Sequence, residues 1–131
     1  MLRTRLCAMV VFTMSGAAAV AAEPTRAPTQ TDMNQAASEA YAQARKALVA
    51  VVAEVEIRAT KPQQRTLRDA QAAWARARDL DCRFEASGAT GGSAQAMVAG
   101  QCLTRKTVER AEALRRYLDC PEGDLACPLR G

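Results

Sequence analysis

The sequence predicts an all-α fold: a small three-helix, up-down-up bundle with a long first helix, stapled by disulfides and preceded by a cleaved signal peptide. Three segments of the chain carry apolar residues at the three- and four-residue steps of an amphipathic helix. Breaks at residues 60–62 and in a glycine-rich stretch at residues 87–93 separate these segments. Four cysteines follow the N-terminal region, an even number that is typical of an oxidising compartment.

Residues 1–22 are typical of an export signal. Arg3 and Arg5 precede a short apolar stretch, and the small residues after it offer cleavage sites ending at Ala21 or Ala22. The apolar stretch is shorter than the ~20 residues that a membrane-spanning helix needs, so a retained anchor is the weaker alternative. We therefore expect a periplasmic or secreted protein with no transmembrane helix after processing.

A flexible leader is expected over residues 23–30, where Pro24 and Pro28 stand without apolar periodicity. A single helical domain is expected over residues 31–128. Cys7 lies in the signal and lacks the small residues that precede a lipid-attachment cysteine, which disfavours lipidation.

Composition argues against several function classes. Loss of two arginines with the signal halves the formal charge of +4, and only 4% of the residues are aromatic, so a nucleic-acid partner is not expected. The chain has no histidine, and its cysteines are expected to pair, so an enzyme is not expected either. The remaining enzymatic alternative is Ser93 with a lysine or carboxylate base. No cofactor and no metal are expected.

The first helix is expected over residues 32–59. Its inward side chains recur at alternating steps of four and three, the heptad spacing. They are Met33, Ala37, Ala40, Ala44, Leu48, Val51 and Val55. Because this seam begins with alanines and ends with larger residues, a partner helix can approach more closely at its first end. Thr60 is the candidate N-cap of the next helix.

The second helix is expected over residues 62–83, with a thin apolar stripe. Its inward residues are expected to be Leu67, Ala70, Trp74, Ala77 and Leu80. Trp74 is the only tryptophan, and one such ring buries roughly 150–250 Å², so it is interpreted as a core anchor. Stacking on a ligand is the alternative for this residue.

The third helix is expected over residues 93–118. Its inward residues are expected to be Ala96, Met97, Gly100, Thr104, Thr107, Ala111, Leu114 and Leu118. Arg110 borders this stripe as Arg78 borders the stripe of the second helix. We expect the two guanidinium groups to pair with carboxylates, and ligand binding is the alternative. The candidate carboxylates are Glu39, Glu54, Asp79 and Asp81.

The four cysteines are expected to pair as Cys82 with Cys102 and Cys120 with Cys127, because each pair then closes a short local loop. Two other pairings remain open. Zinc ligation is the competing hypothesis, and it is disfavoured because the chain has no histidine and no Cys-x-x-Cys pair.

One constellation of residues resembles the LprI-like family of bacterial envelope proteins, whose members are described as lysozyme inhibitors. The resemblance extends over residues 29–128. The matching residues, interpreted as mainly structural, are Asn34, Trp74, Arg78, Asp79, Gly92, Ser93, Thr107, Arg110 and Leu114, together with Cys82 and Cys102. Ala36 stands where the family usually has a cysteine, and its partner in the leader is also absent. Ala77 stands where an aromatic residue is common, which predicts looser packing beside Trp74.

The resemblance implies an exported envelope protein that inhibits lysozyme by protein–protein binding. Lysozyme works through two carboxyl groups in a cleft, so a blocking protein needs a narrow projection that carries hydrogen-bond donors. The expected partner-binding loop comprises Ser87, Gly88, Thr90, Gly91, Gly92 and Ser93. Its glycines permit positive φ angles and argue against a stable helix there. The alternatives are a plain interhelix connection and, for the whole protein, a non-inhibitory structural or interaction module of the periplasm that binds another envelope protein.

Overall fold

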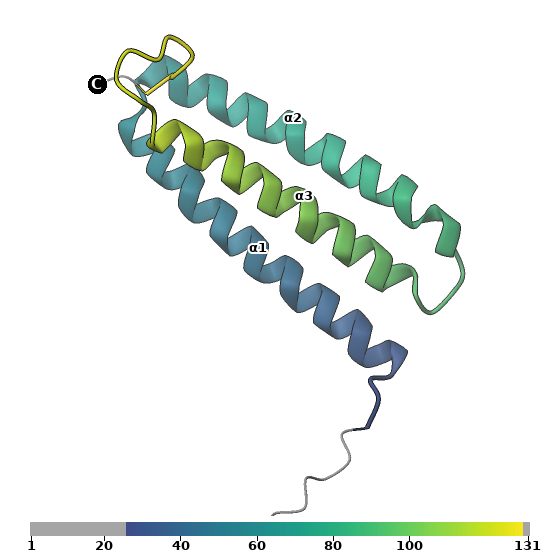
Figure 1. Cartoon of the computed structure of the whole chain (residues 1–131). Coiled ribbons are helices and arrows are strands. Elements are labelled where there is room, and N and C mark those ends of the chain that lie inside the picture. Colours follow the sequence, from purple (N-terminus) through teal and green to yellow (C-terminus); the bar gives the residue numbers. More distant parts are fainter. Residues whose placement is uncertain (1–25, 130–131) are drawn as a thin grey trace, which may run out of the picture.

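The computed structural model describes residues 26–129, so the expected signal, its cleavage sites and the first part of the leader lie outside the described residues. Three α-helices and one short 3₁₀ helix make up the described fold: α1 (Gln30–Arg58), α2 (Lys61–Glu85), η1 (Ala86–Ala89) and α3 (Gln95–Leu118). The all-α prediction is confirmed. Figure 1 shows the up-down-up order. α3 runs alongside α1 in the same direction, and α2, which connects them in the sequence, runs in the opposite direction.

The two helix starts follow from local capping. Thr29 caps α1: the Asp32 N–H donates to its hydroxyl oxygen, while its own N–H donates to the Asp32 carboxylate at 2.8 Å. These hydrogen bonds from the hydroxyl and the N–H of Thr29 hold the pKa of Asp32 below its ordinary value. Thr60 is the N-cap of α2, as predicted, and Pro62 lies in the first turn of that helix.

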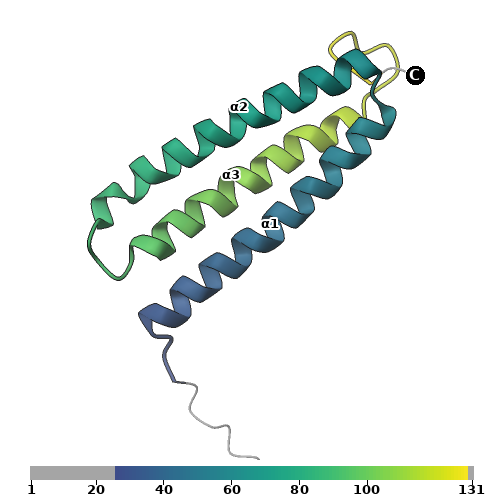
Figure 2. The ribbon, with the colours of Figure 1, turned by 180° about the vertical axis from the view of Figure 1, so that it is seen from behind.

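The closest helix pair is α1 with α3, and small residues make it close. α3 packs along α1 much more extensively than along α2, and both views show α3 in the middle of the three helices (Figures 1 and 2). Gly100 faces Ala37 so closely that a Cβ on the glycine would lie 3.0 Å from the Ala37 Cβ. Ala44 is buried in the same α1 half. The alanine-rich start of the heptad seam therefore permits a near backbone-to-backbone approach.

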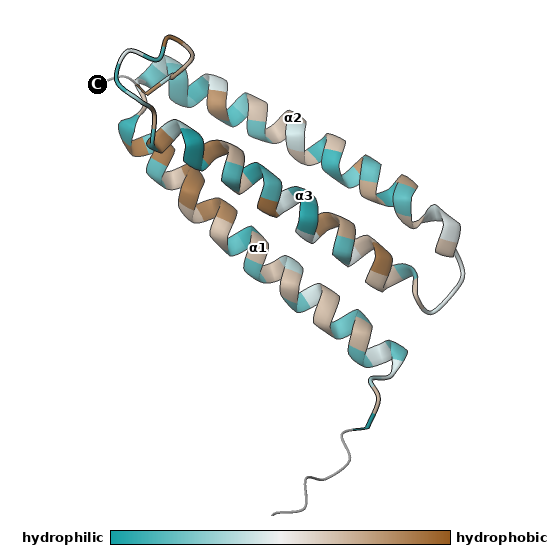
Figure 3. Cartoon of the chain, viewed as in Figure 1, coloured by the Kyte–Doolittle hydropathy of each residue, from teal (hydrophilic) through white to brown (hydrophobic). Residues whose placement is uncertain are grey.

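The larger apolar side chains gather at the opposite end of the α1–α3 pair. This core consists of Leu48, Val51, Val55, Ala111 and Leu114. Figure 3 shows the change along α1, whose second half is more hydrophobic than its first. Leu67 and Trp74 of α2, together with Leu129 of the tail, pack against this core.

The prediction of the inward face of α2 was wrong for part of the stripe. Ala70, Ala77 and Leu80 are exposed, whereas Gln71 and Arg78 join Trp74 on the more buried side. Cys82 fixes the rotation of the helix, because its bond to Cys102 of α3 holds the two Cα atoms 5.5 Å apart. Arg78 lies four residues before this cysteine and therefore shares its face.

Two smaller corrections concern α1 and α3. Ala40 is exposed, and the next residue, Tyr41, turns inward instead. The step from Ala37 to Tyr41 and on to Ala44 also satisfies heptad spacing, so the sequence period alone did not distinguish the two choices. On α3, Ala96 is exposed and Met97 is half-buried.

The C-terminal tail folds back over the end of the bundle where α1 ends and α2 begins. Cys120 and Cys127 are bonded, the predicted pairing, with 5.8 Å between their Cα atoms. The Gln63 side-chain amide, in the first turn of α2, donates to the Pro128 carbonyl. No helix within residues 26–129 is long and apolar enough to cross a membrane.

Candidate functional site

The candidate loop lies where α2 turns into α3, at the end of the bundle opposite the tail (Figure 1). α2 reaches Glu85, two residues beyond the predicted end, and α3 begins at Gln95, two residues later than predicted. Ala86–Ala89 form the 3₁₀ helix η1, although the glycines of this segment predicted no helix. A 3₁₀ turn needs only a few residues, and Ala86, the first residue of η1, is buried.

Glycine is required at one position of the turn that follows η1. Gly91 has a φ of +79°, in the left-handed region that favours glycine. The Gly92 N–H donates to the Ala89 carbonyl at 3.0 Å, and the Gln95 N–H donates to the Gly92 carbonyl at 3.2 Å. The loop is therefore a hydrogen-bonded turn, and its backbone conformation is largely fixed in the absence of a partner.

Asn34 ties this turn to the start of α1. Its side-chain Nδ2 donates to the Ser93 carbonyl at 2.9 Å, and its Oδ1 accepts a hydrogen bond from Gln30. The two residues are 59 positions apart in the sequence, and both belong to the matching residues that were interpreted as mainly structural. The structure shows that this hydrogen bond joins α1 to the loop between α2 and α3.

The Cys82–Cys102 disulfide closes the base of the loop. Both cysteines are buried, and the bond links α2 to α3 one turn below η1. Two ion pairs between the same helices accompany it, Arg105 with Glu85 at 2.7 Å and Lys106 with Asp81 at 2.8 Å. The four side chains are 26–60% exposed, so each pair is expected to contribute little. The disulfide is the main fixed link.

The outer surface of the loop presents polar groups to solvent. Ser87, Thr90 and Ser93 are exposed, and none of their hydroxyl groups forms a hydrogen bond within the described residues. Phe84, two residues before η1, is 82% exposed, and Leu80, one turn earlier on α2, is 60% exposed. The loop and the end of α2 therefore combine free hydroxyl groups with a large exposed ring, a composition that suits contact with another macromolecule.

The remaining residues of the resemblance form a cluster in the middle of the bundle. The Arg78 side chain is only 11% exposed and lies over the Trp74 ring, 4.9 Å from its centroid, and over the Tyr41 ring at 5.5 Å. It pairs with Asp79 at 2.7 Å and reaches the hydroxyl of Thr107, which is completely buried. The predicted ion pair of Arg78 is confirmed, and Tyr41 is a member that the sequence period missed.

Arg110 differs from Arg78. It lies 5.8 Å from the centroid of the Trp74 ring, on which both arginines converge. Its Nε donates to the neutral Gln71 side chain at 2.6 Å, and it forms no ion pair within residues 26–129, so the carboxylate partner predicted for it was wrong. Leu114, one turn further along α3, is fully buried in the apolar core.

These side chains hold helices together. Zinc ligation would need Cys82, Cys102, Cys120 and Cys127 as free thiolates, but all four are in disulfides. The hypothesis that these four cysteines bind zinc was therefore wrong. The Trp74 and Arg78 cluster fixes the distance between α2 and α3, and Asn34 with the disulfide positions the loop. The exposed surface of residues 84–93 is able to contact a partner through its shape and through hydrogen bonds.

Comparison with known proteins gives one match. The family model described as lysozyme inhibitor LprI matches residues 21–114. This range includes α1, α2, the loop and most of α3, and it ends before the disulfide-bonded tail. Neither the curated proteins nor the solved structures contain a significant match.

Proposed function

Because the chain belongs to the lysozyme inhibitor LprI family, we propose that it is an exported, non-enzymatic inhibitor of a lysozyme, which it blocks by binding through the loop at residues 87–93. The observation that carries the proposal is the fixed and exposed state of that loop. A loop that is ordered before binding loses less conformational entropy on insertion into a cleft, so more of the contact energy is retained as affinity.

Three constraints supply this order. The Cys82–Cys102 bond closes the base of the loop, the Asn34 side chain holds the Ser93 carbonyl, and the left-handed Gly91 sets the turn. The exposed hydroxyl groups then face outward as hydrogen-bond donors for the carboxylates of a lysozyme cleft. The Phe84 ring, beside the loop, offers the apolar anchor that dominates the energetics of many protein interfaces.

Electrostatic steering contributes little to this proposal. The whole chain carries a formal charge of +4, and many lysozymes are cationic, so long-range attraction between the two is not expected. Affinity has to come from short-range contacts. Inhibition should therefore change little with ionic strength, in contrast to an inhibitor that relies on an acidic surface.

A turbidity assay with c-type, g-type and i-type lysozymes tests the proposal. The mature protein is expected to slow lysis of a peptidoglycan suspension by at least one of them. The combined variant S87A, T90A and S93A removes three exposed hydroxyl groups without changing the backbone, and it should weaken inhibition by about tenfold or more. The matched control is S38A, an exposed serine on α1. Full inhibition by the triple variant would contradict the role of the loop.

A second candidate function is a structural or interaction module of the periplasm. Exposed apolar residues on α2 favour it: Ala70, Ala77 and Leu80, which the sequence predicted to face inward, and Phe84 near the end of the helix. Absence of inhibition with all three lysozyme types would favour this function over the first. Export itself is checked by N-terminal sequencing of the secreted protein, which should begin directly after Ala21 or Ala22.

A further inference from the structure

A groove between α2 and α3 runs away from the loop toward the tail. It contains two hollows, one of about 450 Å³ beside the tail and one of about 330 Å³ beside Trp74. Arg110 lines both of them. The groove exists because α2 packs against α3 much less closely than α1 does. The larger hollow is within the size range of small-molecule sites, about 300–1,000 Å³.

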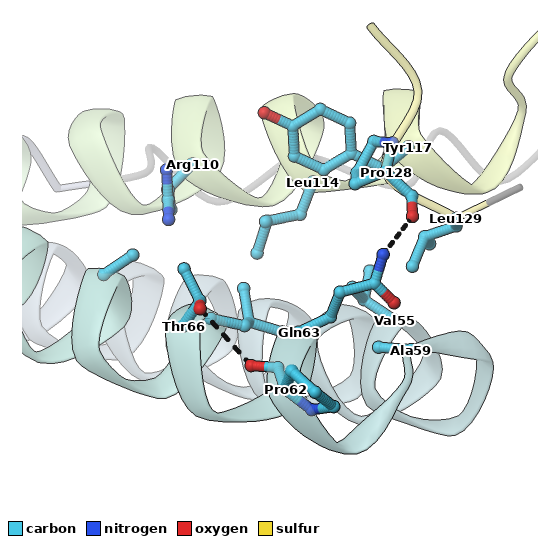
Figure 4. A pocket seen from close by; sticks show the side chains of 12 residues that line it. Val55, Ala59, Pro62, Gln63, Thr66, Arg110, Leu114, Tyr117, Pro128 and Leu129 are labelled. Carbon is cyan, nitrogen blue, oxygen red and sulfur yellow. Dashed lines mark hydrogen bonds between the residues drawn. The ribbon is translucent and has the colours of Figure 1, made fainter. Parts of the chain in front are cut away.

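The larger hollow is mainly apolar and is closed at one end. Figure 4 shows Arg110 at one end, Pro128 and Leu129 at the end formed by the tail, and Leu114 between them. The hydrogen bond from Gln63 to the Pro128 carbonyl fixes the tail over the hollow. The lining therefore has one cation, Arg110, at one end, and mainly apolar side chains along the rest of its length, with Gln63 and Thr66 as the polar exceptions on α2.

Arg110 has no ion-pair partner within the described residues, because the two carboxylates that line the smaller hollow with it, Asp81 and Glu109, pair with Lys106 and Arg105. Arg110 is half-buried, its Nε donates to the neutral Gln71, and its two terminal nitrogens have no hydrogen-bond partner within residues 26–129. The other two cations that line the smaller hollow, Arg78 and Lys106, are already paired with Asp79 and Asp81. A half-buried guanidinium group with free N–H donors favours a carboxylate, which it can bind through two parallel hydrogen bonds.

From these features we propose that the groove binds an anionic amphiphile: a monocarboxylate with an unbranched alkyl chain of medium length. The carboxylate binds the terminal nitrogens of Arg110, and the alkyl chain lies along the apolar hollow toward Leu129. The hollow extends along α2 from Pro62 to Ala70, about 12 Å at the rise of an α-helix, which accommodates a chain of roughly ten carbons. This site lies at the other end of the bundle from the loop, so it is independent of lysozyme inhibition.

Decanoate is a suitable probe, and Trp74 reports its binding. Trp74 is the only tryptophan, and its ring lies beside Arg110, so its fluorescence should change saturably when decanoate binds. Acetate, which lacks the chain, should give no change. Decanol, which lacks the charge, should bind the wild type and the variant R110Q equally. No saturable decanoate signal below the concentration at which decanoate self-associates would overturn the proposal.

Two pairs of variants separate specific binding from surface attraction. R110Q removes the charge and should weaken decanoate binding by about tenfold, whereas R116Q, an exposed arginine on the same helix, should not. A70F places a ring in the hollow and should abolish binding, whereas A73F, on the same exposed side of α2 but outside the lining, should not. Equal losses within either pair would overturn the site. Circular dichroism melts confirm that all four variants are folded.

Discussion

The two ends of the bundle are built differently. At the loop end, α1 and α3 touch through Gly100 and Ala37, and the buried Cys82–Cys102 bond lies between α2 and α3. At the tail end the contacts come from leucine and valine side chains, and α2 stands far enough away to leave a hollow of about 450 Å³. One end of this small protein is therefore closely packed and presents a loop, whereas the other end is more open beneath a disulfide-bonded tail.

The largest expected effect concerns the apolar core of the tail end. L114A removes a side chain that is 1% exposed from the centre of that core, so it should lower the free energy of unfolding by about 4 kcal/mol. I57A, at an 84% exposed position of α1, is the matched control and should cost less than about 0.5 kcal/mol. Denaturant unfolding measures both. Equal costs would show that the tail end has no real core.

The next effect compares the two disulfides. The C82A/C102A variant opens a loop with a sequence separation of 20 and should cost about 3 kcal/mol by the loop-entropy estimate. The C120A/C127A variant, with a separation of 7, should cost about 2.5 kcal/mol. Denaturant unfolding measures both losses of stability, and the informative result is which of the two is larger. A larger loss of stability in C120A/C127A than in C82A/C102A would mean that the tail end, not the loop end, is the more rigid end of the bundle.

Close helix packing at the loop end is tested by G100V. The added side chain meets the Ala37 Cβ and backbone, so overpacking should cost about 2 kcal/mol despite the better helix propensity of a side chain. G88A in η1 is the control, because a Cβ there meets nothing within 4 Å. Thermal unfolding should show a large fall in Tm for G100V alone. An unchanged Tm would mean that α1 and α3 can separate without loss.

A smaller effect is expected for the hydrogen bond between α1 and the loop. N34A removes the donor to the Ser93 carbonyl and should cost about 1 kcal/mol. Hydrogen exchange of the amides at residues 91–95 should become faster, while exchange in the second half of α1 stays the same. The control is Q43A, an exposed amide on the same helix. Faster exchange throughout α1 would indicate a general loss of stability instead.

The smallest effect is a pH dependence at the start of α1. Because the pKa of Asp32 is lowered by hydrogen bonds from Thr29, its carboxylate contributes stability above its ordinary pKa, and this contribution is lost as the pH falls through the lowered value. D32N should therefore lose less Tm than the wild type between neutral and strongly acidic pH. D69N, at an exposed position of α2, is the control. An identical acid loss in D32N and the wild type would contradict the capping interaction.

Much of the fold could be predicted because its signals are local. The heptad seam of α1, the Thr60 cap and the two disulfide pairings follow from spacing and from short sequence separations. The rotation of α2 could not be predicted in the same way. Its true inner face carries Gln71 and Arg78, and an apolar stripe that includes Leu80 lies on its outer side, so a rule based on hydrophobicity selected the wrong face.

The site was predicted only in part, since several of its contacts are between distant residues. The loop and its glycines are visible as a composition change, and the structure has a connection between α2 and α3 there, although the short helix η1 forms its first part. The hydrogen bond from Asn34 to Ser93 joins residues 59 positions apart, and the contact between Tyr41 and Arg78 joins α1 to α2. Nothing in a single sequence indicates such pairs without the spatial arrangement.

The most direct test measures lysozyme inhibition by variants from both ends of the bundle. The S87A/T90A/S93A variant changes the loop end, and A70F fills the hollow at the tail end. In a turbidity assay with the most sensitive lysozyme type, the loop variant should inhibit at least about tenfold more weakly than the wild type, and the A70F variant should inhibit as well as the wild type. Full inhibition by the loop variant together with loss of inhibition by A70F would contradict the assignment of the partner-binding surface to the loop.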